Sequence, residues 1–163
     1  MSYYIEPGEP IAKGLARIGA EQNKKAIEAL EEQDSEAKGI HKARKHFKKL
    51  RAIFRLVRDA TGQPYYKASN VFYRDLGREL APMRDLTSLI EAVDMLEDQF
   101  GKKVKRAPFK ETRHRLRQER DAVRQSLLAE KGKISEVLSA LKDAQGWFGA
   151  LPVEKASLKY TLK

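Results

Sequence analysis

The stretch KGIHKARKHFKKLRAIFRLVR, Lys38 to Arg58, decides the fold because a single helix would sort its residues onto two separate faces. At about 100° per residue, its apolar residues recur three and four positions apart, as on a helix that packs against a core. They are Ile40, Ala43, Phe47, Leu50, Phe54 and Val57. A second stripe with the same spacing lies beside the first and consists of His41, Arg44, Lys48, Arg51, Arg55 and Arg58. The stretch therefore predicts an amphipathic helix with a row of cations along the edge of its core face.

The row of cations has a composition that is unusual for a solvated helix face. The whole stretch contains nine Lys or Arg residues, including Lys45, and no carboxylate. A solvated face usually mixes charges of both signs that pair at i and i+4, whereas these cations repel one another. Arginine supplies four members of the row, and its planar guanidinium binds phosphate oxygens in a bidentate manner. We therefore predict a phosphate-rich anionic ligand, with a solvated helix face as the alternative.

The positive charge of the chain is concentrated in this one stretch. The full sequence of 163 residues has 33 Lys and Arg against 23 Asp and Glu, a formal net charge of +10. Without the nine cations of Lys38 to Arg58, 24 basic residues remain against 23 acidic ones. A concentrated field speeds the capture of an anionic partner more than a dispersed one does.

Helix-period patterns separated by Gly and Pro predict an all-α single domain over residues 1–163. We expect a four-helix-bundle core over residues about 10–101 and one or two additional helices in an extension over residues about 108–148. The predicted helices begin at Pro10, after an N-cap at Asp34 or Ser35, at Pro64, near Arg84, near Phe109 and at Ile134. They end near Gln33, Gly62, Leu80, Gly101, Glu130 and Gln145. Trp147 and Phe148 are expected to pack on the bundle.

The third and fifth predicted helices also carry groups of cations. In the third helix the apolar spacing places Ala68, Phe72, Leu76 and Leu80 inward and leaves Lys67, Arg74 and Arg78 in solvent. In the fifth helix Arg113, Arg117, Arg120 and Arg124 repeat the spacing of three and four. Because Glu111, Glu119 and Asp121 lie nearby, a surface lattice of ion pairs and a ligand face are both open for this helix.

The sequence shows no catalytic motif. It contains no cysteine, no Gly-rich phosphate loop and no His spacing typical of a metal site. We therefore predict a non-enzymatic protein without a cofactor or metal. No apolar run approaches the length of a membrane span, and the cytoplasm is the expected location.

Two alternative functions compete with the binding of a simple polyanion. A nucleic-acid-binding helix would interleave Asn, Gln or exposed aromatic residues with its cations, and none interrupts the row. Nucleic-acid binding is therefore the less favoured partner class. Docking on an acidic partner or on an anionic membrane surface would require outward-facing apolar residues, which are needed here for the core. We therefore predict no membrane partner.

The order of residues along the chain resembles the CHAD family, the conserved-histidine α-helical domain. The resemblance rests on His41, Arg44, Lys48, Leu50-Arg51 and Arg55, and on Leu-Ala-Pro-Met followed by Arg84-Asp85. It implies an all-helical domain that binds inorganic polyphosphate through basic side chains without catalysis, with Arg84 as a phosphate contact oriented by Asp85. The expected polyphosphate-binding residues are His41, Arg44, Lys45, Lys48, Arg51, Arg55, Arg58, Arg84, Arg113 and Arg117.

The resemblance is to the N-terminal half of a family whose members carry two related helical halves. One half would present an open basic trough. We therefore expect a homodimer that forms when polyphosphate neutralises two facing troughs, and an association with polyphosphate granules.

Overall fold

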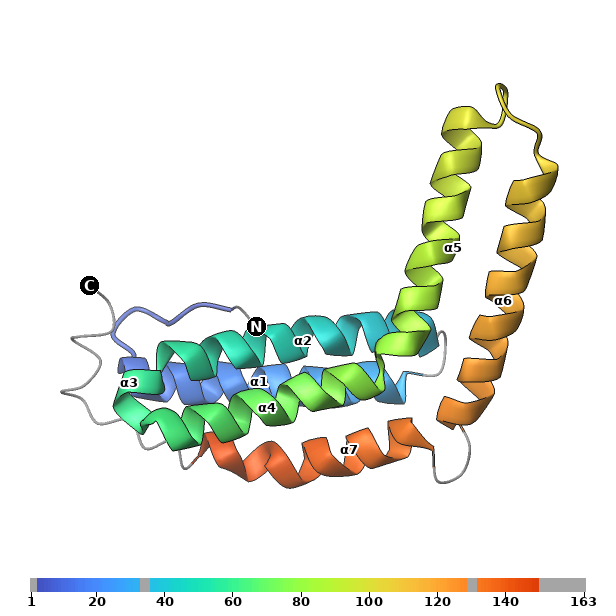
Figure 1. Ribbon diagram of the computed structural model, residues 1–163. Coiled ribbons are helices and arrows are strands. Elements are labelled where there is room, and N and C mark those ends of the chain that lie inside the picture. Colours follow the sequence, from blue (N-terminus) through green and yellow to red (C-terminus); the bar gives the residue numbers. More distant parts are fainter. Residues whose placement is uncertain (1–2, 33–35, 129–131, 150–163) are drawn as a thin grey trace.

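The chain is all-α. The computed structural model describes residues 3–32, 36–128 and 132–149, and among these it contains seven α-helices, one 3-10 helix and no strand (Figure 1). The elements are α1 (Ile11–Glu31), α2 (Glu36–Leu56), α3 (Arg58–Thr61), α4 (Gln63–Glu79), α5 (Ala81–Phe100), α6 (Ala107–Leu128), α7 (Lys133–Asp143) and η1 (Ala144–Phe148). The prediction of an all-α helical bundle is confirmed.

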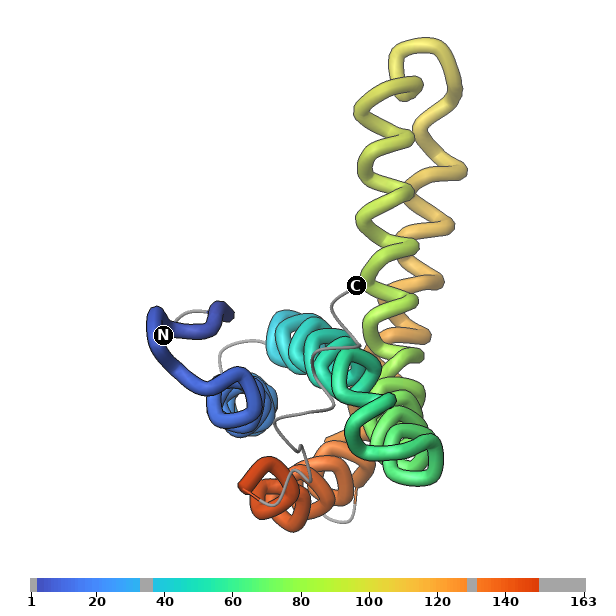
Figure 2. Tube along the Cα trace, turned by 90° about the vertical axis from the view of Figure 1, so that its left-hand side faces the viewer, coloured from blue at the N-terminus to red at the C-terminus, as the bar shows by residue number. Residues whose placement is uncertain are grey.

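Four helices, α1, α2, α4 and α7, lie side by side and enclose the main hydrophobic core (Figures 1 and 2). Phe54 of α2 stands at its centre. Its ring centroid lies 5.8 Å from that of Tyr73 in α4 and 5.7 Å from that of Phe148 in η1. Trp147 covers the edge of this cluster, with its ring centroid 4.7 Å from that of Phe72. Both Trp147 and Phe148 therefore pack on the bundle.

The helices that make up the core differ from those the sequence suggested. α5 and α6 pair with each other and project from the bundle as a long hairpin (Figures 1 and 2). Leu89 and Leu96 fall within residues 10–101, the range predicted for the core, but they are 51% and 47% exposed on α5. Val137 and Leu141 of α7 are 1% and 0% exposed instead. Thus α7 completes the core between α1 and α4, and only the first half of α5 contributes buried residues.

Proline and glycine lie at the helix boundaries, as the sequence predicted. Pro64 and Pro82 lie in the first turns of α4 and α5. The missing N–H of proline costs nothing there, because the first amides of a helix have no intrahelical acceptor. Gly62, between α3 and α4, has φ of 84°, in the region that favours glycine. The predicted N-cap at Asp34 or Ser35 lies outside the described residues.

α4 is rotated about its axis relative to the prediction. Ser69 and Tyr73 are buried, whereas Ala68 is exposed, so the expectation that Ala68 faces the core is wrong. The Tyr73 hydroxyl donates to Oδ1 of Asn23 over 3.0 Å, and Nδ2 of Asn23 donates to the carbonyl of Leu141 over 2.8 Å. These bonds require Tyr73 to point inward. The rotation also turns the face of α4 that lies beside Tyr73 toward α2.

Candidate functional site

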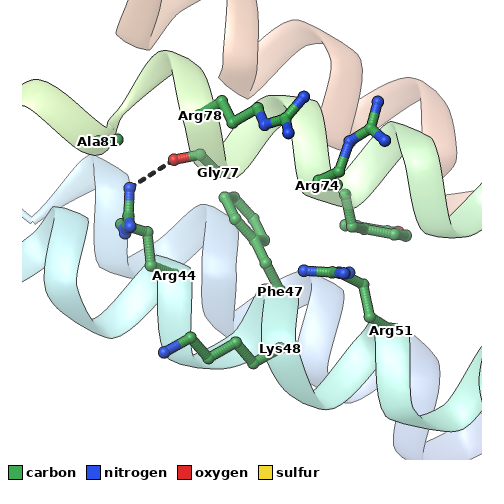
Figure 3. A pocket seen from close by; sticks show the side chains of 9 residues that line it. Arg44, Phe47, Lys48, Arg51, Arg74, Gly77, Arg78 and Ala81 are labelled. Carbon is green, nitrogen blue, oxygen red and sulfur yellow. Dashed lines mark hydrogen bonds between the residues drawn. The ribbon is translucent and has the colours of Figure 1, made fainter.

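A groove lies between α2 and α4 and consists of two adjoining cavities of about 230 Å³ and about 260 Å³. Both are lined by Lys48 and Arg51, so the two cavities lie next to each other along α2. The first is also lined by Arg44, Phe47, Tyr73, Arg74, Gly77, Arg78 and Ala81 (Figure 3). The second is also lined by Ala52, Arg55, Tyr66 and Asn70. Because Phe47 and Tyr73 are buried core residues, the groove has an aromatic floor and cationic walls.

The four α2 cations of the groove have no carboxylate partner among the residues that the structure describes. A terminal nitrogen of Arg44 donates to the carbonyl oxygen of Gly77 over 2.5 Å (Figure 3). Nε of Arg51 donates to Oδ1 of Asn70 over 2.9 Å. Lys48 and Arg55 form no side-chain hydrogen bond or ion pair within the described part of the chain. The charge of this wall is therefore available to an anion.

α4 supplies two further cations, which the sequence had assigned to solvent. Arg74 binds Asp75 through two hydrogen bonds of 2.8 and 3.1 Å, and Arg78 lies 3.5 Å from the same carboxylate. The hydrogen bond from Arg74 lowers the pKa of Asp75. In Figure 3 both arginines stand on the wall of the groove opposite Lys48 and Arg51. Their position could have been predicted from the sequence only by placing Tyr73 in the core, because its inward position turns Arg74 and Arg78 toward α2.

The structure thus has a row of basic residues that begins with His41 on one helix. An Arg-Asp pair follows near the start of a later helix. A family model described as CHAD domain matches residues 18–162. The chain belongs to the CHAD family. No curated protein and no solved structure matches the chain.

At one end of the groove, this CHAD domain places His41 near Arg84. His41 lies one turn before Arg44 on α2, and its pKa is lowered by desolvation and then by the charges of Arg84 and Lys45. Arg84, in the first turn of α5, donates to Oε2 of Glu91 over 3.1 Å. Asp85 makes no side-chain cap at the start of α5. The partner that orients Arg84 in the structure is therefore Glu91, and not Asp85 as expected.

The remaining predicted site residues of the CHAD domain lie outside the groove. Arg58 begins α3 beyond Arg55 and pairs with Asp59 over 3.1 Å. Arg113 of α6 is held within the hairpin by Glu97 and, over 2.6 Å, by Asp94. Arg117 is exposed on α6 and lines neither cavity.

On α6 of the CHAD domain, the contacts favour the lattice of ion pairs over a ligand face. Arg115 pairs with Glu111 over 2.8 Å and Arg120 pairs with Asp121 over 3.1 Å. Two members of the basic stripe of α6, Arg113 and Arg120, therefore bind carboxylates, as does Arg115 beside the stripe. The structure therefore does not bring α6 cations to the α2 row.

A metal centre and a membrane-spanning helix are two further features that could mark a site in this CHAD domain. Within residues 3–32, 36–128 and 132–149, no three His, Cys, Asp or Glu side chains are grouped so that they could hold a metal ion. None of the helices in those ranges combines the length and the apolar character needed to cross a bilayer.

Proposed function

We propose that this CHAD domain binds inorganic polyphosphate, without catalysing a reaction, in the groove between α2 and α4. The observation that carries the proposal is the α2 wall, where Arg44, Lys48, Arg51 and Arg55 have no carboxylate partner among the described residues. Unpaired cations that lie one helical turn apart along a single wall repel one another, and a bound polyanion relieves that repulsion. Family membership supports the same ligand class.

The spacing of the α2 cations suits a linear ligand. Residues three or four apart on a helix rise by about 5–6 Å, so the row from Arg44 to Arg55 extends for about 16 Å along the helix axis. A chain that lies along α2 meets one cation per helical turn, while Arg74 and Arg78 approach it from the other wall. His41 and Arg84 lie beyond one end of the row and Arg58 lies beyond the other, where they would contact a longer ligand. Lys45 follows Arg44 in α2, is exposed and lines neither cavity. Granules rich in polyphosphate in the cytoplasm are the location that this ligand implies.

A competition titration tests the proposal. Long-chain polyphosphate should displace a labelled polyphosphate probe at a lower phosphate concentration than duplex DNA does, because the groove walls match a narrow chain. Equal or stronger displacement by DNA would contradict the proposal.

Single substitutions distinguish binding by positioned groove residues from binding by net positive charge alone. Arg51→Ala and Arg55→Ala should each weaken binding and reduce the slope of log affinity against log salt by about one, because one phosphate contact is lost. Lys49→Ala is the matched control, since its Nζ lies 5.0 Å above the ring of Tyr3 and not in the groove. Equal losses for all three variants would show that net charge alone binds the ligand.

One observation favours a second candidate function, the binding of a nucleic-acid strand. Tyr66 and Asn70 line the second cavity beside Arg51 and Arg55. An aromatic ring and a carboxamide are groups that stack on bases and read their edges. In the same titration, stronger displacement by single-stranded DNA than by polyphosphate, lost in Tyr66→Leu, would favour this function.

A further inference from the structure

A second cluster of cations lies at the tip of the projecting hairpin, far from the groove. The tip is GKKVKRAPFK, Gly101 to Lys110, with five cations and no carboxylate. Its cations are Lys102, Lys103, Lys105, Arg106 and Lys110, and all five side chains are exposed. None of them forms a side-chain hydrogen bond or ion pair with another residue that the structure describes. The tip therefore presents an uncompensated positive charge.

The tip is a convex turn that is stabilised by hydrogen bonds within its own backbone. The α5–α6 hairpin carries it away from the bundle (Figures 1 and 2), and the 20 residues of α5 make that helix about 30 Å long. The amide of Gly101 donates to the carbonyl of Glu97 over 2.7 Å. The amides of Lys103 and Val104 both donate to the carbonyl of Phe100, over 2.7 and 3.0 Å. These bonds close the turn, so its side chains point outward around a defined backbone.

An apolar side chain is exposed in the middle of the cations. Val104, between Lys103 and Lys105, is 52% exposed, and Phe100 at the end of α5 is 38% exposed. Outward-facing apolar residues are the feature that a membrane-docking surface requires and that the α2 row lacks. The tip therefore combines the two chemical elements of a surface that binds anionic lipid.

Acidic residues separate the tip from the groove. Glu91, Asp94 and Asp98 lie on α5 between the two, and none of them is buried. A polyanion that extended from the groove along α5 would pass these carboxylates. The tip is therefore a separate site and not a continuation of the groove.

We propose that the hairpin tip docks on an anionic lipid bilayer, with Val104 entering the headgroup region and the surrounding cations contacting lipid phosphates. A free phosphate chain is the weaker match, because a convex tip has no walls to enclose it and the chain makes no use of an exposed valine. A flat anionic surface is reached first by the part of a molecule that projects farthest, and its charge is complementary to the tip. This proposal does not depend on what the groove binds.

Vesicle sedimentation with the full chain tests whether the hairpin tip binds anionic lipid. The protein should sediment with vesicles of phosphatidylcholine and phosphatidylserine but not with vesicles of phosphatidylcholine alone, and salt should reduce the bound fraction. The double variant K102Q/K103Q should lower the partition coefficient about tenfold or more, because cations near the surface contribute strongly to binding. Val104→Asn, which leaves the charge unchanged, should also weaken binding. The matched control K13Q/K24Q removes two exposed cations of α1 and should bind as the wild type does.

Polyphosphate binding by the same variants assigns each ligand to its site. K102Q/K103Q should keep wild-type affinity for polyphosphate, and R51A/R55A should keep wild-type vesicle binding. Equal vesicle loss in K13Q/K24Q, or loss of vesicle binding in R51A/R55A, would overturn the proposal. Loss of polyphosphate binding in K102Q/K103Q, with vesicle binding retained, would assign the tip to phosphate chains instead. If the groove proposal alone failed, the wild type would bind vesicles but not polyphosphate.

Discussion

Nε of Arg51 on α2 donates a hydrogen bond of 2.9 Å to Oδ1 of Asn70 on α4, so one wall of the groove orients a cation of the other. The bond uses only the Nε–H of the guanidinium. The two terminal nitrogens form no hydrogen bond with the described residues and remain available for a bidentate contact with phosphate. Asn70 is therefore a positioning residue for Arg51.

Asn70→Ala should weaken polyphosphate binding about fivefold, the equivalent of one hydrogen bond of about 1 kcal/mol. Because no charge is removed, the dependence of affinity on salt should keep its wild-type slope. Titrations at several salt concentrations measure both quantities. Arg51→Ala is the control, because it should lower both affinity and slope. A reduced slope in Asn70→Ala, or unchanged affinity, would contradict a positioning role.

Gly77→Leu should block the groove without altering its charge. A Cβ at Gly77 would meet Phe47 at 3.7 Å, an ordinary contact, and Gly77 lines the first cavity, so a longer side chain extends into it. We expect at least about a tenfold loss of polyphosphate affinity, measured by titration, because the ligand must approach the cations within hydrogen-bond distance. Gly77→Ala is the size control and should retain most of the affinity. Full binding by Gly77→Leu would show that polyphosphate does not enter this cavity.

Gly39→Ala should destabilise the protein, although alanine is the better helix former. A Cβ at Gly39 in α2 would clash with the carbonyl oxygen of Ala29 in α1, a backbone atom that cannot move aside cheaply. We expect a loss of about 1–3 kcal/mol in the free energy of unfolding, as for other overpacked sites. Gly77→Ala, which has room, should gain about 0.5–1 kcal/mol. Urea unfolding of both variants checks the opposite signs, and a stabilising Gly39→Ala would show that the two helices do not approach so closely.

Polyphosphate affinity should rise as the pH falls, through protonation of His41. Desolvation and the charges of Arg84 and Lys45 lower the pKa of His41, so its ring is neutral at pH 7 and gains a proton only below the ordinary histidine value of about 6.5. A polyanion binds the protonated form more tightly. The ratio of wild-type to His41→Ala affinity should therefore increase on acidification, and taking this ratio cancels any protonation of the ligand. A ratio that does not vary with pH would place His41 outside the ligand contact.

The sequence was sufficient to predict the α2 row because its geometry depends on a single helix. Arg44, Lys48, Arg51 and Arg55 share a face wherever α2 packs. Joining Arg74 to them requires knowledge of how α4 is rotated against α2, which depends on contacts between helices. The buried residue Ser69 is polar, so counting apolar residues led to Ala68 instead.

The spacing of apolar residues could not predict, for a related reason, that α7 would take the place of α5 in the core. Leu89 and Leu96 form an apolar stripe on α5, but a stripe does not say whether another helix covers it. Arg113 posed the same difficulty, because the carboxylates that bind it, Asp94 and Glu97, come from a different helix. Helix existence was predictable from the sequence, whereas helix pairing was not.

The hydrogen bond from Asn23 to Leu141 has a consequence for the order in which the chain folds. It joins residues 118 positions apart, and Asn23 also accepts the bond from Tyr73. Contacts of such separation form late, because a long loop must close before they contribute any stability. As the polypeptide leaves the ribosome, α1, α2 and α4 are available to associate first, with Phe54 and Tyr73 open to water on the side that α7 and η1 later cover. We therefore expect docking of α7 to limit the rate at which native molecules appear, and the open intermediate to be the species that aggregates.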